Sequence, residues 1–245
     1  MKYFTYDWFR DIWLPAAGAI LIPVAIAFFT WWFGASRAEK QKELRDLRDN
    51  LNLLTSISMA TLNSINFLYD RVAKIQLNIK KTTKNLKKLS QNSEIPDVDK
   101  ICYGFVFDNM YKDIPLNQYT SCLVYHKNFI YNLSIIKSLI TLTETYICKR
   151  NKIIEDIANI IDLSVMNSRY RNFILNEEKE IDKFLYDICR IALLLQIVIT
   201  DIQVIGKKNR KLKLVDAYIS PNQSEFLNIA SKTVSNKDKI FNNDG

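Results

Sequence analysis

The sequence predicts an all-α protein in which an N-terminal transmembrane helix continues into a long stalk-like helix and is followed by a cytoplasmic helical bundle. Residues 12–33 carry no formally charged side chain, and neither glycine nor proline occurs between Gly34 and Pro96. Later apolar residues recur at helical spacing. The 245 residues include only 5 Gly and 5 Pro, which argues against Gly-rich phosphate loops and a turn-dense β fold.

The predicted membrane anchor is the segment IWLPAAGAILIPVAIAFFTWWF. As a helix it would be about 33 Å long, against about 30 Å for a hydrocarbon core. A single span must be helical to satisfy its backbone groups in lipid. Pro23 at mid-span predicts a kink, and Trp13, Trp31 and Trp32 mark the two interfaces. The alternatives are a cleaved signal peptide, for which the segment is too long, and a buried core helix.

The flanking charges predict the orientation of this anchor. Lys2 and Arg10 precede it, whereas five cations follow it within fifteen residues: Arg37, Lys40, Lys42, Arg45 and Arg48. Lysine and arginine are retained on the cytoplasmic side. We therefore expect a single-pass protein of the cell inner membrane, N-out and C-in, with residues 1–11 as a short external tail and 12–34 as the transmembrane helix.

Residues 35–90 read as one long amphipathic helix. Stepping three and four residues from Leu44 to Leu89 meets apolar residues almost throughout, with Ser58, Thr61 and Thr82 as the exceptions. Such a seam predicts a coiled coil, and hence a homo-oligomer through the 44–89 seam. The alternative is a long helix packed on the later helices of its own chain. The polar layer at Ser58 and Thr61 predicts a local bend.

The rest of the chain divides into three parts. Residues 91–128 form an irregular, aromatic-rich insertion that caps the bundle, 129–206 a helical bundle segment, and 207–245 a basic and then polar flexible tail. Within the bundle segment we expect helices at 129–150, 152–166 and 177–205, with a polar connection at 168–176. The stretch 187–205 is apolar enough to suggest a second span, but Asp201 costs about 2.5–3.5 kcal/mol on insertion, which favours a buried helix.

Basic residues concentrate in two stretches of a chain whose formal net charge is +8. They are candidates for binding anionic lipid, nucleic acid or an acidic partner, with a solvated surface as the alternative. The first stretch comprises Lys80, Lys81, Lys84, Lys87 and Lys88, and the second Lys207, Lys208, Arg210, Lys211 and Lys213.

No pattern in the chain indicates catalysis. Cys122 and His126 form a C-x3-H pair with no second pair in the chain, whereas zinc needs four ligands. The Walker, dinucleotide, hydrolase and metalloprotease motifs are missing. We therefore expect no catalytic residue, no metal site and no cofactor. Arg190 and Asp201 fall on one helix face and are expected to pair inside the bundle. The cysteines are expected to be free thiols in a reducing compartment.

This layout resembles the small transmembrane effectors of bacterial anti-phage systems, in particular the membrane proteins encoded beside retron reverse transcriptases. The resemblance rests on the span at residues 12–33, the charged stalk from Arg37 and a helical body without catalytic motifs. It implies abortive infection: the protein is held inactive by a reverse transcriptase with its RNA–DNA product, and compromises the inner membrane when released. Those proteins usually have two spans, and the second would here be 187–205.

Two other functions fit the same sequence. One is a non-toxic membrane tether or scaffold that localises a cytoplasmic partner through its helical domain. The other is a membrane-bound sensor that recognises a ligand through the aromatic insertion near Tyr103 to Tyr125.

Overall fold

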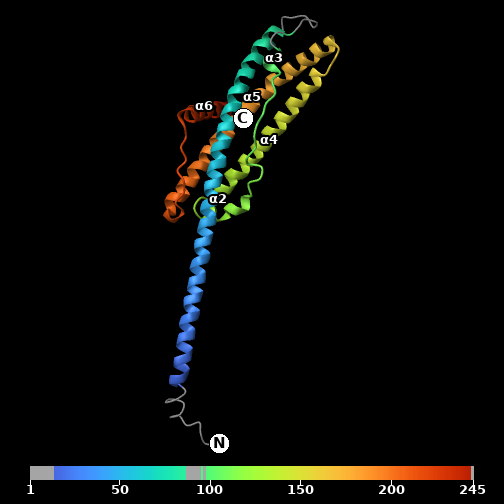
Figure 1. The fold of residues 1–245 in the computed structure, drawn as a ribbon. Coiled ribbons are helices and arrows are strands. Elements are labelled where there is room, and N and C mark those ends of the chain that lie inside the picture. Colours follow the sequence, from blue (N-terminus) through green and yellow to red (C-terminus); the bar gives the residue numbers. More distant parts are fainter. Residues whose placement is uncertain (1–13, 87–94, 96–97, 244–245) are drawn as a thin grey trace. The chain divides into compact units, whose positions relative to one another are not determined.

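The computed structural model describes residues 14–86, 95 and 98–243, with side chains between residues 22 and 237 of these ranges. The chain divides into two compact units, residues 1–49 and 50–245. All regular elements in the described ranges are helical, which confirms the predicted all-α class. In order they are α2 (Leu14–Leu86), α3 (Val98–Ile101), the 3-10 helix η2 (Leu116–Val124), α4 (Phe129–Ala158), α5 (Leu163–Lys208), the 3-10 turn η3 (Arg210–Leu212) and α6 (Pro221–Asn243) (Figure 1).

In the first unit the described residues belong to the start of α2, a 73-residue helix that continues through Pro23. Eight large apolar side chains between Ile22 and Phe33 are 51–68% exposed. Their aromatic rings contact one another along the helix, as Phe28 and Phe29 do with centroids 6.1 Å apart. The predicted anchor and stalk are thus one helix from Leu14 onward. Trp13 and the predicted tail 1–11 lie outside the described residues.

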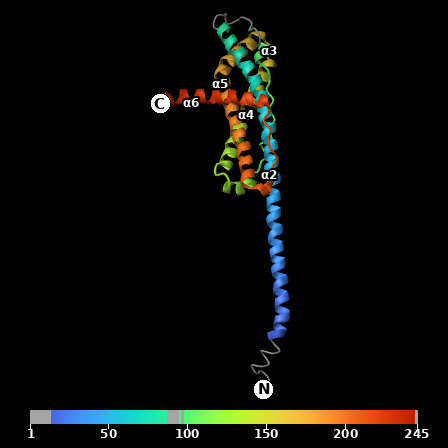
Figure 2. The same cartoon turned by 90° about the vertical axis from the view of Figure 1, so that its left-hand side faces the viewer.

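In the second unit, α2 forms one wall of the bundle and its seam faces inward. All seam positions from Leu51 to Leu86 are buried, including Ser58 and Thr61. Elements of the same chain cover them: the Ser58 and Tyr111 hydroxyls lie 2.5 Å apart, and α6 packs on α2 (Figures 1 and 2). The structure therefore has the alternative arrangement, a long helix packed on its own chain. Between Leu51 and Leu86, a coiled coil through this seam would need the face that the bundle already occupies. Leu44 and Leu47 are only half-buried, and residue 89 lies outside the described residues.

The predicted insertion 91–128 is an irregular segment packed against the bundle, as far as it is described. Buried side chains spaced along the segment attach it to the bundle. No strand forms between Ile101 and Phe107. Short helices α3 and η2 are its regular elements. The buried anchors are Ile95, Ile101, Phe105, Tyr111, Ile114, Tyr119 and Cys122.

The bundle segment has two long helices where the sequence predicted three shorter ones. α4 continues past the predicted end at residue 150, and α5 includes the predicted connection 168–176. The turn lies at residues 159–162, where Asp162 accepts hydrogen bonds from the backbone N–H of Ser164 at 2.8 Å and Val165 at 3.3 Å. This cap satisfies two of the free N–H groups at the start of α5.

Helix α5 is the one helix among the described side chains that is long and apolar enough to cross a membrane. Of the most apolar 18-residue stretch of this helix, 56% is buried within the protein. A helix that is apolar nearly all round belongs either in a core or in a bilayer. Here the neighbours are α4 and α6, which lie along and across α5 (Figures 1 and 2).

The prediction of a flexible tail is wrong for its larger part, because residues from Pro221 form α6. Ser220 and Gln223 make a reciprocal capping box: the Ser220 N–H donates to Gln223 Oε1 at 2.7 Å, and the Gln223 N–H donates to Ser220 Oγ at 3.3 Å. Phe226 and Ala230 are buried on the inner face of the helix. Lys237 also donates to the Asp182 carbonyl of α5 at 3.0 Å.

Candidate functional site

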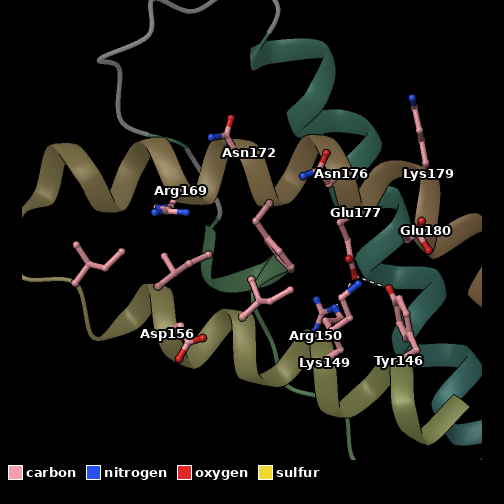
Figure 3. A pocket seen from close by; sticks show the side chains of 14 residues that line it. Tyr146, Lys149, Arg150, Asp156, Arg169, Asn172, Asn176, Glu177, Lys179 and Glu180 are labelled. Carbon is pink, nitrogen blue, oxygen red and sulfur yellow. Dashed lines mark hydrogen bonds and ion pairs between the residues drawn. The ribbon is translucent and has the colours of Figure 1, made fainter. Parts of the chain in front are cut away.

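A cleft of about 870 Å³ opens between the C-terminal half of α4 and the N-terminal half of α5 (Figure 3). Its volume lies within the range of about 300–1,000 Å³ that is typical of ligand sites. Ile153 and Ile157 line it from α4, Ile160 lines it from the turn that follows, and Phe173 lines it from α5. Charged side chains form the rim and one end: Lys149, Asp156, Arg169, Lys179, Glu180, Arg150 and Glu177.

A buried ion pair closes one end of the cleft. Arg150 is 2% exposed and Glu177 is 6% exposed, and Arg150 Nε donates to Glu177 Oε1 at 2.6 Å. The other two guanidinium nitrogens donate to the backbone carbonyls of Tyr103 at 2.5 Å and Ile101 at 2.7 Å. The guanidinium also lies 4.2 Å from the ring centroid of Phe105. Arg150 therefore attaches the extended segment 101–105 to α4 and α5.

Tyr146 completes this polar cluster. Its hydroxyl donates to Glu177 Oε1 at 2.6 Å (Figure 3). Burial, followed by the charge of Glu177, raises the pKa of Tyr146, so the phenol stays protonated and acts as a donor. Glu177 Oε1 on α5 thus receives two hydrogen bonds, both from α4, and these charge-assisted bonds hold the two helices together.

The cleft is large enough to hold a small molecule. Cys102 lies in the segment that Arg150 holds, and burial raises the pKa of its thiol to about 12. A thiol with such a pKa is neutral at physiological pH and unreactive. The described residues contain no group of three or more His, Cys, Asp or Glu side chains that could hold a metal ion.

The lone histidine lies elsewhere in the bundle and has an acidic partner. His126 Nε2 is 3.2 Å from Asp201 Oδ1 on α5. The predicted pairing of Asp201 with Arg190 is therefore wrong; the Arg190 guanidinium lies 5.6 Å from the ring centroid of Tyr186. Burial raises the pKa of Asp201, while His126 opposes that shift.

The structure places the two basic stretches at opposite ends of the bundle. Lys80 lies 3.3 Å from Asp182 Oδ1, and Lys81 and Lys84 are exposed, whereas Lys87 and Lys88 lie outside the described residues. The second stretch lies beside Asn52, because the Val215 N–H donates to Asn52 Oδ1 at 3.0 Å. Along α2, Lys80 is about 40 Å from Asn52 at about 1.5 Å per residue. The two stretches do not form one continuous surface.

Of the predicted anchor residues, three are described. Pro23 lies inside α2, and Trp31 and Trp32 are 68% and 53% exposed. Such exposure of tryptophan on an apolar stretch is unusual for a surface in water.

Sequence analysis missed the Arg150–Glu177 pair. One signal was available: stepping by three and four residues along α4 from Ile136 passes Ile140, Thr143 and Ile147 and then reaches Arg150, which places this cation on the buried face. A cation on a buried face requires a buried partner.

The comparisons with known proteins identify no relative of this chain. No family model matches the chain, and neither the curated proteins nor the solved structures contain a significant match.

Proposed function

We propose that this chain is a single-pass protein of the bacterial inner membrane, N-out and C-in, whose anchor is residues 12–34. Its role is that of a tether: the helical second unit is held at the cytoplasmic face of the membrane, where it receives a partner. The observation that carries the proposal is the continuous exposed apolar surface of α2 between Ile22 and Phe33.

The exposure has a direct energetic consequence. Eight large apolar side chains in succession are at least half exposed, and burying one such side chain is worth about 1.5–3 kcal/mol. The sum is comparable with the whole stability of an ordinary domain, about 5–15 kcal/mol. A bilayer supplies the missing burial, and the helical backbone already satisfies its own hydrogen bonds, as lipid requires.

The apolar part of α5 is the competing candidate for a span, and its packing supports a place in the bundle. Asp201 is buried beside His126, and Ile191, Leu195 and Val198 are completely buried by the protein itself. Moving α5 into lipid would remove these contacts, and it would not reduce the number of apolar side chains that are exposed to water. We therefore propose one span.

The second candidate role is the antiviral effector implied by the resemblance to retron-associated membrane proteins, with a reverse transcriptase and its RNA–DNA product as the inhibitory partner. The exposed cations at Lys81, Lys84 and residues 207–213 favour it, because they offer surfaces to a nucleic-acid-bearing partner. The buried seam favours the tether, since clustering of anchors through residues 44–89 would require the bundle to open.

Membrane fractionation tests the anchor. The full chain should stay in the membrane pellet through an alkaline carbonate wash. Replacing Ile26 and Phe29 by Asp adds about 2.5–3.5 kcal/mol per residue to insertion and should release it. The matched control is Leu53→Asp with Leu77→Asp, two equally exposed apolar residues outside the anchor, which should stay in the pellet. Release of the unmodified chain by carbonate would contradict the proposal.

Expression in bacteria separates the two roles. A tether leaves growth and membrane potential unchanged at high expression. An effector depolarises the membrane, either alone or after its inhibitory contact is lost. Replacing the five lysines at positions 80, 81, 84, 87 and 88 by glutamine should release toxicity or abolish partner binding if this stretch holds the effector inactive. Unchanged growth in both cases favours the tether.

A further inference from the structure

Five cations gather where α5 ends, and we call this group the basic turn. All five are exposed, and none forms an ion pair with a carboxylate in the described parts of the chain. Lys208 has one protein partner, the backbone carbonyl of Tyr125 at 3.0 Å. The basic turn consists of Lys207, Lys208, Arg210, Lys211 and Lys213.

The backbone that carries these cations is fixed on both sides. Leu212 is completely buried in the middle of the turn. Leu214 packs on Gly206, where an added Cβ would lie 3.0 Å from Leu214 Cδ1, so the close approach depends on the glycine. The Val215 N–H then donates to Asn52 Oδ1 at 3.0 Å. The cations therefore extend from a folded surface and not from a loose tail.

Lys213 adopts a left-handed conformation, with φ 46° and ψ 56°. Glycine or asparagine is the usual residue there, and a lysine costs conformational energy. Such conformations cluster at functional sites and also occur at helix ends, and Lys213 is the residue that ends η3. Here it directs the chain so that Lys213 lines a cavity of about 490 Å³ together with Lys207 and Arg210. Three cations thus share one cavity, to which Asp216 contributes one carboxylate.

Stabilisation of the helix end explains only part of this group. The dipole of α5 favours cations in its last turn, which contains Lys207 and Lys208. Arg210, Lys211 and Lys213 lie beyond the end of the helix, where the dipole effect fades within one turn. Solvent and salt screen the repulsion between these exposed cations in part, and a bound anion would reduce it further.

We infer that the basic turn binds the phosphate groups of anionic phospholipids in the membrane that holds the anchor. This inference rests on the proposed function. Asn52, which bonds to Val215, follows Phe33 so closely in the chain that the two lie at most about 65 Å apart even if the segment is fully extended. An anchored chain therefore confines the basic turn to a limited distance from one lipid surface, which raises its effective concentration there.

Nucleic acid is the less favoured ligand. Affinity for nucleic acid grows with the number of phosphates that cations neutralise, whereas the first basic stretch, from Lys80 to Lys84, lies at the opposite end of the bundle and does not extend this surface. A compact group of cations matches an anionic leaflet, where each Lys or Arg near the surface strengthens association by roughly fivefold.

Lysine acetylation of the full chain in lipid nanodiscs tests the inference. The discs contain phosphatidylcholine alone, or phosphatidylcholine and phosphatidylglycerol in equal amounts, and mass spectrometry reports the rate at each lysine. We expect Lys207, Lys211 and Lys213 to react about fivefold more slowly in the anionic discs. Lys81 and Lys84, exposed at the other end of the bundle, serve as internal controls and should not change.

Two further arms identify the source of the phosphate. In phosphatidylcholine discs, inorganic phosphate or a single-stranded RNA is added instead of anionic lipid. Equal protection by inorganic phosphate, or stronger protection by RNA, would overturn the inference in favour of a soluble ligand. Equal rates in all arms would also overturn it.

A pair of variants checks that the group acts together. Arg210→Gln with Lys211→Gln should reduce the protection of Lys207 and Lys213 by anionic lipid, whereas Lys81→Gln with Lys84→Gln should leave it intact. Co-elution of the chain with neutral discs reports the anchor separately. A chain that co-elutes but is not protected defeats only this inference; a chain that fails to co-elute with neutral discs defeats the proposed function.

Discussion

Glu177→Gln is the most informative single change in the bundle. It keeps the size of the side chain and its hydrogen-bonding oxygen but removes the negative charge beside Arg150, whose guanidinium is almost completely buried. Removing one partner of a buried ion pair costs about 3–5 kcal/mol, because the remaining charge is left uncompensated. Arg150 retains the Ile101 and Tyr103 carbonyls, so we expect the lower part of this range.

The assay is thermal unfolding of the full chain, monitored by far-UV circular dichroism. Tryptophan fluorescence would not report on the bundle, because all four tryptophans precede Gly34 in the sequence. For a unit of this size each kcal/mol lowers Tm by about 2–4 °C, so a loss of about 3 kcal/mol corresponds to roughly 6–12 °C.

Two control variants test whether the loss of stability comes from the unpaired buried charge. Glu180→Gln changes an exposed carboxylate at the rim of the same cleft and should alter the free energy of unfolding by less than about 0.5 kcal/mol. Arg150→Met combined with Glu177→Gln removes both charges and keeps an acceptor for Tyr146, and it should recover part of the loss, because the Ile101 and Tyr103 carbonyls lose their donor. A Glu177→Gln variant as stable as the wild type, or a double variant as unstable as the single one, would refute the role assigned to this pair.

Three further predictions follow from buried polar groups. Burial raises the thiol pKa of Cys122 and Cys189 to about 11, so a maleimide should label exposed Cys148 much faster than these two in the native chain, and equal rates by mass spectrometry would contradict their burial. Burial raises the pKa of Asp201, so the wild type should lose stability relative to Asp201→Asn as pH rises from about 4 to 7, and parallel urea-unfolding curves would contradict this. Tyr111→Phe leaves the buried Ser58 hydroxyl without its partner and should cost about 1–3 kcal/mol in chemical unfolding, whereas an unchanged midpoint would exclude the hydrogen bond.

The helical class and the inward face of α2 were predictable from the sequence because both depend on periodicity. Leucines and isoleucines from Leu51 to Leu86 mark a face that must be buried. Periodicity does not identify the covering partner, which can equally be a second chain or the later helices. The same limit applies to the polar seam residue Ser58, whose contact with Tyr111 depends on the tertiary fold.

The helix boundaries that were predicted wrongly lie at polar residues, because these residues make contacts inside the bundle. The break predicted near Arg150 treated a cation as an exposed helix end, although it is among the most buried side chains. The tail was predicted to be loose from its polar composition. Its capping box at Ser220 and Gln223 and the apolar spacing of Phe226, Leu227 and Ala230 were sufficient to predict a helix.

The central claim is that the N-terminal stretch of α2 lies in lipid, and the tryptophans test it directly. Since all four tryptophans belong to residues 1–33, the intrinsic fluorescence of the reconstituted full chain reports on this region alone. If the anchor lies in lipid, lipids with brominated acyl chains should quench this fluorescence strongly. Quenching should be greater for bromines near the head groups than for bromines deeper in the chains, because Trp31 and Trp32 are expected at the interface. Fluorescence that no brominated lipid quenches, but that a water-soluble quencher abolishes, would contradict the account.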